Sequence, residues 1–591
     1  MPDVNPKRRA SPRVAYFSME VGLESHLPTY SGGLGVLAGD SLRAAADIRL
    51  PLVGVTLAHR EGYFRQELDA TGRQAESPDP WNPEDHLEEV GPRVALELMG
   101  RQVHIRGWRY VVRGAAGGEV PVYLLDTDLP ENEDEDRALT DHLYGGDRRY
   151  RLQQEAVLGI GGIRFLRAAG HRKIHTYHLN EGHSALLCLA LLEERAGVRG
   201  LARATARNER AVRERCVFTT HTPVPAGHDR FEMPVVREVL GEEYALAVEG
   251  RGTEGGFLNM SELAFHFSRW SNGVAYRHGQ ISRAMFPGRT IGAITNGVHV
   301  RTWTAPSMAE LFDRHLTGWR QDPMQLRHAA ALPLDELRQA HAAAKARLLD
   351  EVGLRTGVDL SPEAFTLGFA RRATPYKRAD LLLSDPARLA RIARRGGGMQ
   401  VLYAGKAHPR DEGGKHLIRT IHHVAEKLAR DVKVVYIPGY DMELGGLMTA
   451  GVDVWLNNPE KPKEASGTSG MKACLNGVPN LSVLDGWWIE GHVEGVTGWS
   501  LDEDWTDPDD RAAEADTLYR KLEAVILPLY YGDPEGFARV RRGAIAVNGG
   551  HFSTRRMMLQ YATDAYRMNV GPGEPFPRPA APPRGSRVRA R

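Results

Sequence analysis

Residues 365–378 read FTLGFARRATPYKR, and this stretch decides much of the fold. Its first five residues, Phe365–Phe369, form a short apolar run of the kind found in buried strands. Four cations follow the strand within eight residues: Arg371, Arg372, Lys377 and Arg378. Like charges placed close together repel each other, and an anion among them offsets the repulsion. The stretch therefore predicts either an anion site at the carboxyl end of a strand or a solvated run paired with acids.

Similar apolar or β-branched runs recur along the chain and alternate with helical patterns. Leu417, Ile421, Val424 and Leu428 are spaced by four, three and four residues, which places them on one helical face. This alternation predicts an α/β fold with parallel sheets covered on both faces. The other expected strands are Val14–Phe17, Pro51–Leu57, Val120–Leu125, Ile174–Leu179, Val217–Thr220, Gln400–Tyr403, Val432–Ile437, Val452–Leu456 and Leu481–Leu484.

The alternation fades near residues 295–303 and restarts at Phe365, so we place a domain boundary near residue 305. A length of 591 residues favours about two large domains. We expect two doubly wound domains that face a cleft, with ligands beyond the carboxyl ends of the strands. The expected divisions are a disordered tail at 1–13, domains at 14–305 and 306–552, a last helix at 553–569, and a disordered tail rich in Pro and Arg at 570–591.

Composition excludes several classes of partner. Lys and Arg together number 76 and Asp and Glu number 75, so net charge gives no attraction to nucleic acid or to an anionic membrane. Cys188, Cys216 and Cys474 are far apart, which favours buried reduced thiols over a disulfide or a metal site. No apolar run approaches the roughly 20 residues of a membrane helix, and residues 1–13 lack the apolar centre of a signal peptide. A cytoplasmic enzyme fits these observations best.

Residues 31–35, SGGLG, form a second candidate anion site. They lie between an expected strand and a helix expected to begin at Val36. Glycines in this position let backbone amides approach an anion at the helix N-terminus. An ordinary tight turn is the simpler explanation of a glycine cluster taken alone.

Residues 463–477, KEASGTSGMKACLNG, form a third candidate site, with hydroxyls and glycines before a helix expected to begin at Met471. A phosphate is well placed at such a helix N-terminus. Lys472 would fall in the first turn, where a cation opposes the helix dipole and costs a few tenths to about 1 kcal/mol. Partial desolvation would lower its pKa and favour an imine with an aldehyde cofactor. A surface lysine, or one that contacts phosphate, explains the residues equally well.

The nine residues 464–472, EASGTSGMK, closely resemble the EASGTGNMK signature of the α-glucan phosphorylase family and differ from it at two positions. YSGGLGVLAGDSL, RRATPYKR and TNGVHVRTW resemble the family's NGGLGRLA, KRxxxYKR and TNGITPRRW motifs, in the same chain order. The likeness extends discontinuously from Val14 to Tyr566 and is closest to a compact bacterial-type branch. It implies two facing Rossmann-like domains of GT-B-type glycosyltransferase architecture, with the active site in the cleft between them.

The resemblance also implies the reaction. Glycogen, starch and maltodextrin phosphorylases carry pyridoxal 5′-phosphate on the final lysine of the signature. They use inorganic phosphate to release terminal α-1,4-linked glucose from a glucan as α-glucose 1-phosphate, with retention. The 5′-phosphate of the cofactor acts there as an acid–base partner, since a phosphate exchanges protons near neutral pH. Relatives commonly form dimers, which leaves a homodimer open, and their last helix crosses back to the first domain.

Each site residue is assigned by its match to a family motif. Lys472 would hold the cofactor as a Schiff base, with Tyr440 near the pyridine ring. Arg372 and Lys377 would bind inorganic phosphate at the catalytic centre, where Glu464 would bind glucose hydroxyls. The surroundings of the cofactor phosphate would include Thr468, Ser469, Arg371 and Gly33, and the substrates would contact Gly32, Gly33, Asp147, His183, Ala465, Ser466 and Gly467.

Several positions depart from the family pattern. The histidine of the KR…YKR motif is Thr374 here, the histidine before the NGVA block is Arg269, and an aspartate is replaced by Glu181. The asparagine that binds the glucose 6-hydroxyl has no clear counterpart after Trp303. Two alternatives therefore stay open: a nucleotide-sugar glucosyltransferase of the glycogen-synthase type, which shares the GGLG loop, and a catalytically weak glucan-binding protein. An aminotransferase-type pyridoxal enzyme leaves the glycine and basic segments without a role.

Overall fold

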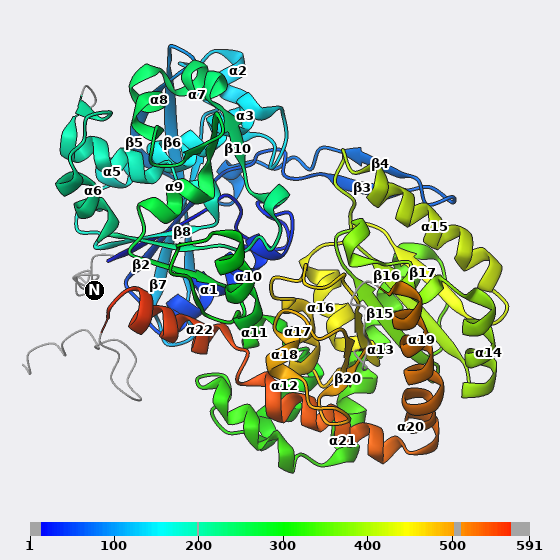
Figure 1. Cartoon of the computed structure of the whole chain (residues 1–591). Helices are drawn as coiled ribbons and strands as arrows, with labels where there is room; N and C mark the ends of the chain where they lie inside the picture. Colours follow the sequence, from blue (N-terminus) through cyan, green and yellow to red (C-terminus); the bar gives the residue numbers. More distant parts are fainter. Residues whose placement is uncertain (1–12, 198–199, 502–509, 569–591) are drawn as a thin grey trace, which may run out of the picture.

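The computed structural model of the chain describes residues 13–197, 200–501 and 510–568 (Figure 1). The described part contains two large β-sheets flanked by helices, so the prediction of an α/β fold with parallel sheets is confirmed. The predicted disordered tails, 1–13 and 570–591, lie outside the described residues except for Arg13.

The first sheet is built from β1 (Val14–Ser18), β2 (Leu52–Leu57), β5 (Glu88–Leu98), β6 (Arg101–Arg113), β7 (Glu119–Asp126), β8 (Thr176–Asn180), β9 (Cys216–Thr219), β13 (Trp270–Gly273) and β14 (Gly292–Ala293). Their order is β14-β13-β9-β8-β1-β2-β7-β6-β5. Neighbours from β14 to β7 are parallel, whereas β6 and β5 are antiparallel. Sequence analysis missed β5 and β6 because their exposed positions interrupt the apolar run that marks a fully buried strand.

The second sheet is built from β15 (Phe365–Ala370), β16 (Met399–Ala404), β17 (Lys433–Ile437), β18 (Val454–Asn457), β19 (Asn480–Ser482) and β20 (Gly498–Ser500). Their order is β17-β16-β15-β18-β19-β20, and all neighbouring pairs are parallel. Every strand expected from the sequence lies in one of these two sheets, with ends that differ by up to two residues.

The strand order of each sheet reverses around its first strand. β1 lies between β2 and β8, and β15 lies between β16 and β18. Loops that leave the carboxyl ends of such strands run in opposite directions and open a crevice, which is where ligands bind in sheets of this kind. The SGGLG loop follows β1, and the basic loop 371–378 follows β15.

The helices cover the sheet faces and bury most of the apolar side chains. A further apolar cluster joins α1 to the elements around the second sheet through Val36, Trp303 and Met471. The longer helices are α1 (Gly33–Asp47), α3 (Arg148–Ala156), α5 (Leu187–Ala196), α10 (Tyr276–Met285), α12 (Pro306–His315), α13 (Leu334–Thr356), α14 (Pro386–Gly396), α15 (Glu412–Leu428), α16 (Met442–Gly451), α19 (Arg511–Lys521) and α21 (Pro534–Ala544). Two shorter helices, α17 (Thr468–Leu475) and α22 (Thr554–Gln560), also matter for the site and for the end of the chain.

The last described helix, α22, lies against the first sheet although it follows the second in the chain (Figure 1). The Tyr566 hydroxyl is 2.7 Å from His178 Nδ1, and the Tyr561 hydroxyl accepts a hydrogen bond of 3.0 Å from Asn272 Nδ2. These buried bonds attach the end of the chain to β8 and β13. The segment 549–553 therefore links the two halves of the molecule.

Candidate active site

The four cations of the basic loop 371–378 differ in the contacts that they make. Arg378 adopts a φ of 51°, and its guanidinium donates to the carbonyl oxygens of Asn458 and Pro459, each at 2.9 Å. The same guanidinium pairs with Glu514. Arg378 thus fixes the loop that follows β18, and it is not free to bind an external anion.

Glu464 lies between two of the remaining cations. Its Oε2 accepts hydrogen bonds from Arg371 Nη2 at 2.6 Å and from Lys377 Nζ at 2.9 Å. Burial alone would raise the pKa of Glu464, but Arg371 and Lys377 outweigh this effect and lower the pKa. Asn457, which sequence analysis missed, accepts a further bond from Arg371. A carboxylate of the chain itself therefore supplies the negative charge that two of the clustered cations require.

Arg372 makes no hydrogen bond or ion pair with any residue that the structure describes. A Cβ atom on Gly32 would lie 3.6 Å from Arg372 Nη2, so the guanidinium faces the glycine loop. Partial desolvation lowers the pKa of Arg372, but interactions with Tyr63 and Glu20 outweigh it and raise the pKa. An unpaired guanidinium opposite backbone amides is suited to bind a phosphate.

The glycine loop presents a helix N-terminus to Arg372. Helix α1 begins at Gly33, three residues before the start predicted at Val36, and Gly32 provides no side-chain cap. The carboxylate of Glu20, another residue missed by sequence analysis, accepts hydrogen bonds from the Ser31 amide at 2.6 Å and the Gly32 amide at 3.2 Å. A Cβ atom on Gly33 would meet no atom within 4 Å. The start of α1 at Gly33 therefore faces open space, where the helix dipole favours an anion.

Lys472 is buried, with 8% of its surface exposed. Helix α17 begins at Thr468 and not at Met471, so Lys472 lies in the last turn. The expectation that this lysine opposes the helix dipole is wrong, since a cation near the C-terminus interacts favourably with it. The pKa of Lys472 is lowered to about 8, mainly by desolvation; Asp40 opposes the change and Arg43 adds to it. The amine is thus partly neutral near pH 8 and reactive toward an aldehyde.

The N-terminus of α17 follows the loop that carries Glu464. Its N-cap is Gly467, with a φ of 91° and no side chain to satisfy the first amides. Ser469 Oγ accepts a bond of 3.2 Å from Trp455 Nε1, and Ser466 Oγ is buried without a partner among the described residues. Ala465 and Thr468 are half-buried beside them. This loop offers free donors for a phosphate group.

Of the three other predicted site residues, His183 and Asp147 have partners of their own. Tyr440 follows β17, and burial raises its pKa to about 12, with nearby Asp441 raising it and Arg371 lowering it. His183 Nε2 is 3.3 Å from Asp229 Oδ2. Asp147 caps α3 by accepting a bond of 2.9 Å from the Tyr150 amide. Within the described residues no hydrogen bond or ion pair joins His183 or Asp147 to Arg372 or Lys472.

Of the three departures from the family pattern, the side chains of Arg269 and Glu181 have partners in the structure. Thr374 Oγ1 is buried and finds no partner in the described part of the chain. Arg269 donates to the Ala565 carbonyl at 2.7 Å and thereby helps to attach the end of the chain. The carboxylate of Glu181 accepts bonds from the His221 amide at 2.8 Å and Thr222 Oγ1 at 2.9 Å.

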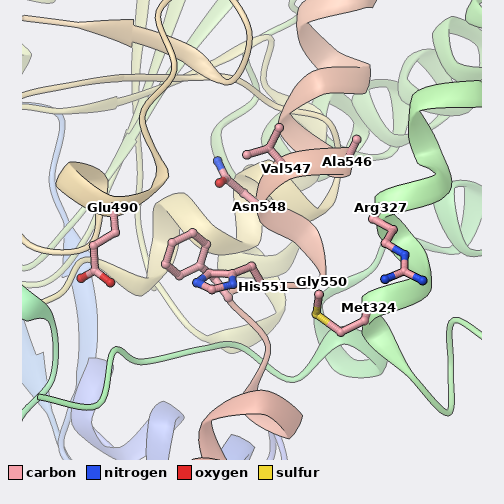
Figure 2. A pocket seen from close by; sticks show the side chains of 9 residues that line it. Met324, Arg327, Glu490, Ala546, Val547, Asn548, Gly550 and His551 are labelled. Atoms are coloured by element: carbon pink, nitrogen blue, oxygen red, sulfur yellow. The ribbon is translucent and has the colours of Figure 1, made fainter.

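Two cavities lie away from this cluster of site residues. One, of about 330 Å³, opens beside the linking segment 549–553, with Met324, Arg327 and Glu490 on its wall (Figure 2). The other, of about 360 Å³, is lined by Arg60 and Trp81 among others. Neither contains a predicted site residue. The candidate active site is therefore defined by its charges and contacts, and not by either of these cavities.

Two further findings concern membrane helices and metal ligands. No helix within residues 13–197, 200–501 or 510–568 is long and apolar enough to cross a membrane. The same described residues contain no group of His, Cys, Asp and Glu side chains placed to hold a metal ion. The site combines a buried lysine, an arginine without a partner among the described residues, and helix N-termini beyond parallel strands. This combination is typical of enzymes that bind phosphate groups.

Comparison with known proteins identifies the family. Residues 251–495 match the family model described as carbohydrate phosphorylase. The chain is 37% identical to the maltodextrin phosphorylase of Thermococcus litoralis, 36% identical to the glycogen phosphorylase of Mycobacterium bovis and 32% identical to that of Aquifex aeolicus. Each match covers 94% of this chain, and 70%, 70% and 86% of the respective relatives. The chain belongs to the carbohydrate phosphorylase family, and the resemblance based on EASGTSGMK is confirmed.

Proposed function

We propose that this protein is an α-glucan phosphorylase, which transfers the terminal α-1,4-linked glucose of a glucan to inorganic phosphate. In this reaction the bond from C1 to the next glucose breaks and a bond from C1 to a phosphate oxygen forms with retention, while the departing glucan oxygen takes a proton. The observation that carries the proposal is the unpaired Arg372 guanidinium opposite the open N-terminus of α1. Similarity to maltodextrin and glycogen phosphorylases supports it.

We propose further that the two sheets belong to two facing Rossmann-like domains, 14–305 and 306–552, with the site in the cleft between them. The support is topological. The loops after β1 and β15 both leave strands where the strand order reverses, and Gly32 from one loop lies near Arg372 from the other. The segment predicted as a last helix, 553–569, would return to the first domain. Within it the structure has α22 and a π-helix at Tyr561–Ala565, and residue 569 lies outside the described residues.

The residues present fit pyridoxal 5′-phosphate. The Lys472 amine has a lowered pKa and makes no hydrogen bond to a described residue, and Ser466 Oγ is buried without a partner in the described part of the chain. Lys472 would hold the cofactor, Tyr440 would lie near its ring, and Thr468, Ser469 and Arg371 would surround its phosphate, next to the Gly33 amide. When bound, the cofactor would supply a 5′-phosphate able to exchange a proton near pH 7.

The chain's own residues would perform three tasks. Arg372 and Lys377 would bind inorganic phosphate, and the N-terminus of α1 would add the partial charge of its amides. Two phosphates held close together repel strongly, so the surrounding cations must offset their charge. Glu464 would keep Arg371 and Lys377 in place through its Oε2. Its Oε1 has no hydrogen bond to a described residue and would accept one from a glucose hydroxyl.

One comparison tests the proposal: formation of glucose 1-phosphate from maltodextrin and phosphate by the wild type and by Lys472→Ala. The wild type should be active and should absorb in the near ultraviolet, where a bound pyridoxal group absorbs and a nucleotide does not. Lys472→Ala should lose both properties. An active wild type without this absorbance would contradict the cofactor assignment, and an inactive wild type that retains it would contradict the proposed reaction.

A further inference from the structure

A hairpin from the first half of the chain reaches the second sheet. It consists of β3 (Arg65–Leu68) and β4 (Gln74–Ser77), which follow β2 in sequence but lie beside α15 (Figure 1). Leu68 packs against the core of the second sheet, and Lys415 of α15 pairs with Glu76 at 3.0 Å. A Cβ atom on Gly72, in the turn, would come within 2.3 Å of the His422 ring. The hairpin is therefore a close-fitting connection between the two halves.

Two glutamines make the polar contacts of this connection, and both are nearly fully buried. Gln66 Nε2 donates to Gln74 Oε1 at 2.8 Å and to the Gly405 carbonyl at 2.9 Å. Gln66 Oε1 accepts from the Gly439 amide at 3.1 Å. One side chain thus joins the loop after β16 to the loop after β17.

Gln74 binds the next residues of the same loop. Its Nε2 donates to the Ala407 carbonyl at 2.9 Å, and its Oε1 accepts from the Ala407 amide at 3.0 Å. The side chain therefore imitates the paired bonds of a β-ladder. The two side chains also bond to each other, and Gln74 Nε2 donates to Glu76 Oε1 at 2.8 Å. Their partners on the second half of the chain are all backbone groups, so this network fixes the positions of the loops themselves.

The loops held by the glutamines contact the candidate active site directly. A Cβ atom on Gly405, which has a φ of 137°, would lie 1.9 Å from the Arg371 carbonyl oxygen, so the two backbones are in close contact. The Ala373 amide donates to the Lys406 carbonyl at 3.1 Å. Gly439 immediately precedes Tyr440. Displacement of these loops would move Arg371, Arg372 and Tyr440 relative to the glycine loop.

We propose that Gln66 and Gln74 are positioning residues for phosphorolysis. They fix the spacing between the glycine loop on the first half and the phosphate-binding arginines on the second. The inference rests on the proposed function. A displacement of about 1 Å in such an arrangement can cost on the order of 10²-fold in rate, although neither glutamine touches a reacting atom.

The test compares Gln66→Met with Glu67→Ala. Methionine has a similar volume but cannot form the hydrogen bonds, and Glu67 is the exposed neighbour on the same strand. Gln66→Met should raise KM for phosphate at least tenfold and lower kcat less, with the near-ultraviolet absorbance of bound cofactor unchanged. Glu67→Ala should match the wild type. The proposal is overturned if KM for phosphate in Gln66→Met stays within twofold of the control.

Gln66→Glu provides a rescue experiment. Its carboxylate would face the oxygens of Gly405 and Gln74 without a proton to donate, and burial would raise its pKa. Protonation restores one donor, so kcat/KM relative to the wild type should rise as pH falls from 7.5 to 5.5. A constant ratio across this range would count against the positioning role.

The outcomes separate this inference from the proposed function. A wild type that makes no glucose 1-phosphate refutes the function, whatever the variants do. An active wild type with a normal Gln66→Met refutes only the positioning role. If Gln66→Met does not fold, Gln74→Met and Gln66→Glu provide the same comparison against Glu67→Ala.

Discussion

Lys472 Nζ lies 3.3 Å from the centre of the Trp303 ring. Trp303 ends the short helix α11 (Val300–Trp303), and its Nε1 donates to Asp40 Oδ2 of α1 at 2.7 Å. The indole thus connects the buried lysine to the first helix of the chain. An aromatic face attracts the ammonium, while loss of solvent favours the neutral amine. This contact places the lysine amine where the two halves of the molecule meet.

Loading of cofactor-free protein with pyridoxal 5′-phosphate should depend on pH. The reactive amine is neutral only above its pKa, which desolvation lowers to about 8 for Lys472. As pH increases toward 8, the initial loading rate should therefore rise about tenfold per pH unit. Above pH 8 the rate should level off. The growth of near-ultraviolet absorbance measures the rate, and Lys472→Ala is the control. A rate that is constant between pH 6 and 8 would contradict the assignment.

Arg372→Ala should abolish phosphate binding without removing the cofactor. Arg372 has no protein partner among the described residues, so its loss leaves no charge unpaired in the fold. We expect kcat/KM for phosphate to fall by about 10²–10³-fold, as for other groups that stabilise developing charge. Kinetics at varied phosphate and a near-ultraviolet spectrum check this. Loss of the near-ultraviolet absorbance would mean that Arg372 binds the cofactor phosphate instead. The control is Arg73→Ala, which changes an exposed residue of the hairpin.

Glu464→Gln should change the dependence of stability on pH. The folded-state pKa of Glu464 is lowered from 4.5, so its ion pairs stabilise the fold fully above about pH 4.5 and lose this effect as pH falls through the folded pKa. Above pH 4.5 the variant should be less stable by about 3–5 kcal/mol, because two buried cations lose their partner. Chemical denaturation at several pH values measures the difference. A gap that does not shrink below pH 4.5 would contradict the ion-pair role.

Arg378→Ala should destabilise the protein rather than alter phosphate affinity. The substitution removes a buried ion pair with Glu514 and two bonds to backbone carbonyls. We expect a loss of about 3–5 kcal/mol in the free energy of unfolding. Lysine should restore little of it, because it lacks the planar fork of donors. Arg394→Ala, which breaks an exposed pair with Asp431, should cost at most about 1 kcal/mol. Equal losses of unfolding free energy in Arg378→Ala and Arg394→Ala would contradict this prediction.

Most of the parallel strands could be predicted from the sequence because a strand buried on both faces is mostly apolar, as in Phe365–Ala370. The short parallel strands β13, β14 and β20 were missed. The antiparallel hairpin of β5 and β6 could not be predicted, since its outer positions are exposed and carry charges. Helix starts were also misplaced. Gly33 and Thr468 begin helices among residues with poor intrinsic helix propensity, which tertiary packing overrides.

The sequence by itself determined the residue types of the site and its family, because EASGTSGMK and RRATPYKR specify chemistry through their order along the chain. Which acidic side chain each cation pairs with depends on the tertiary structure. Arg378 pairs with Glu514, and Arg371 and Lys377 share Glu464. Arg372 has no partner in the part of the chain that the structure describes. Each of these acidic partners is more than 80 residues away in sequence. Pairing across such distances depends on which strand ends meet, and local residue patterns do not encode that.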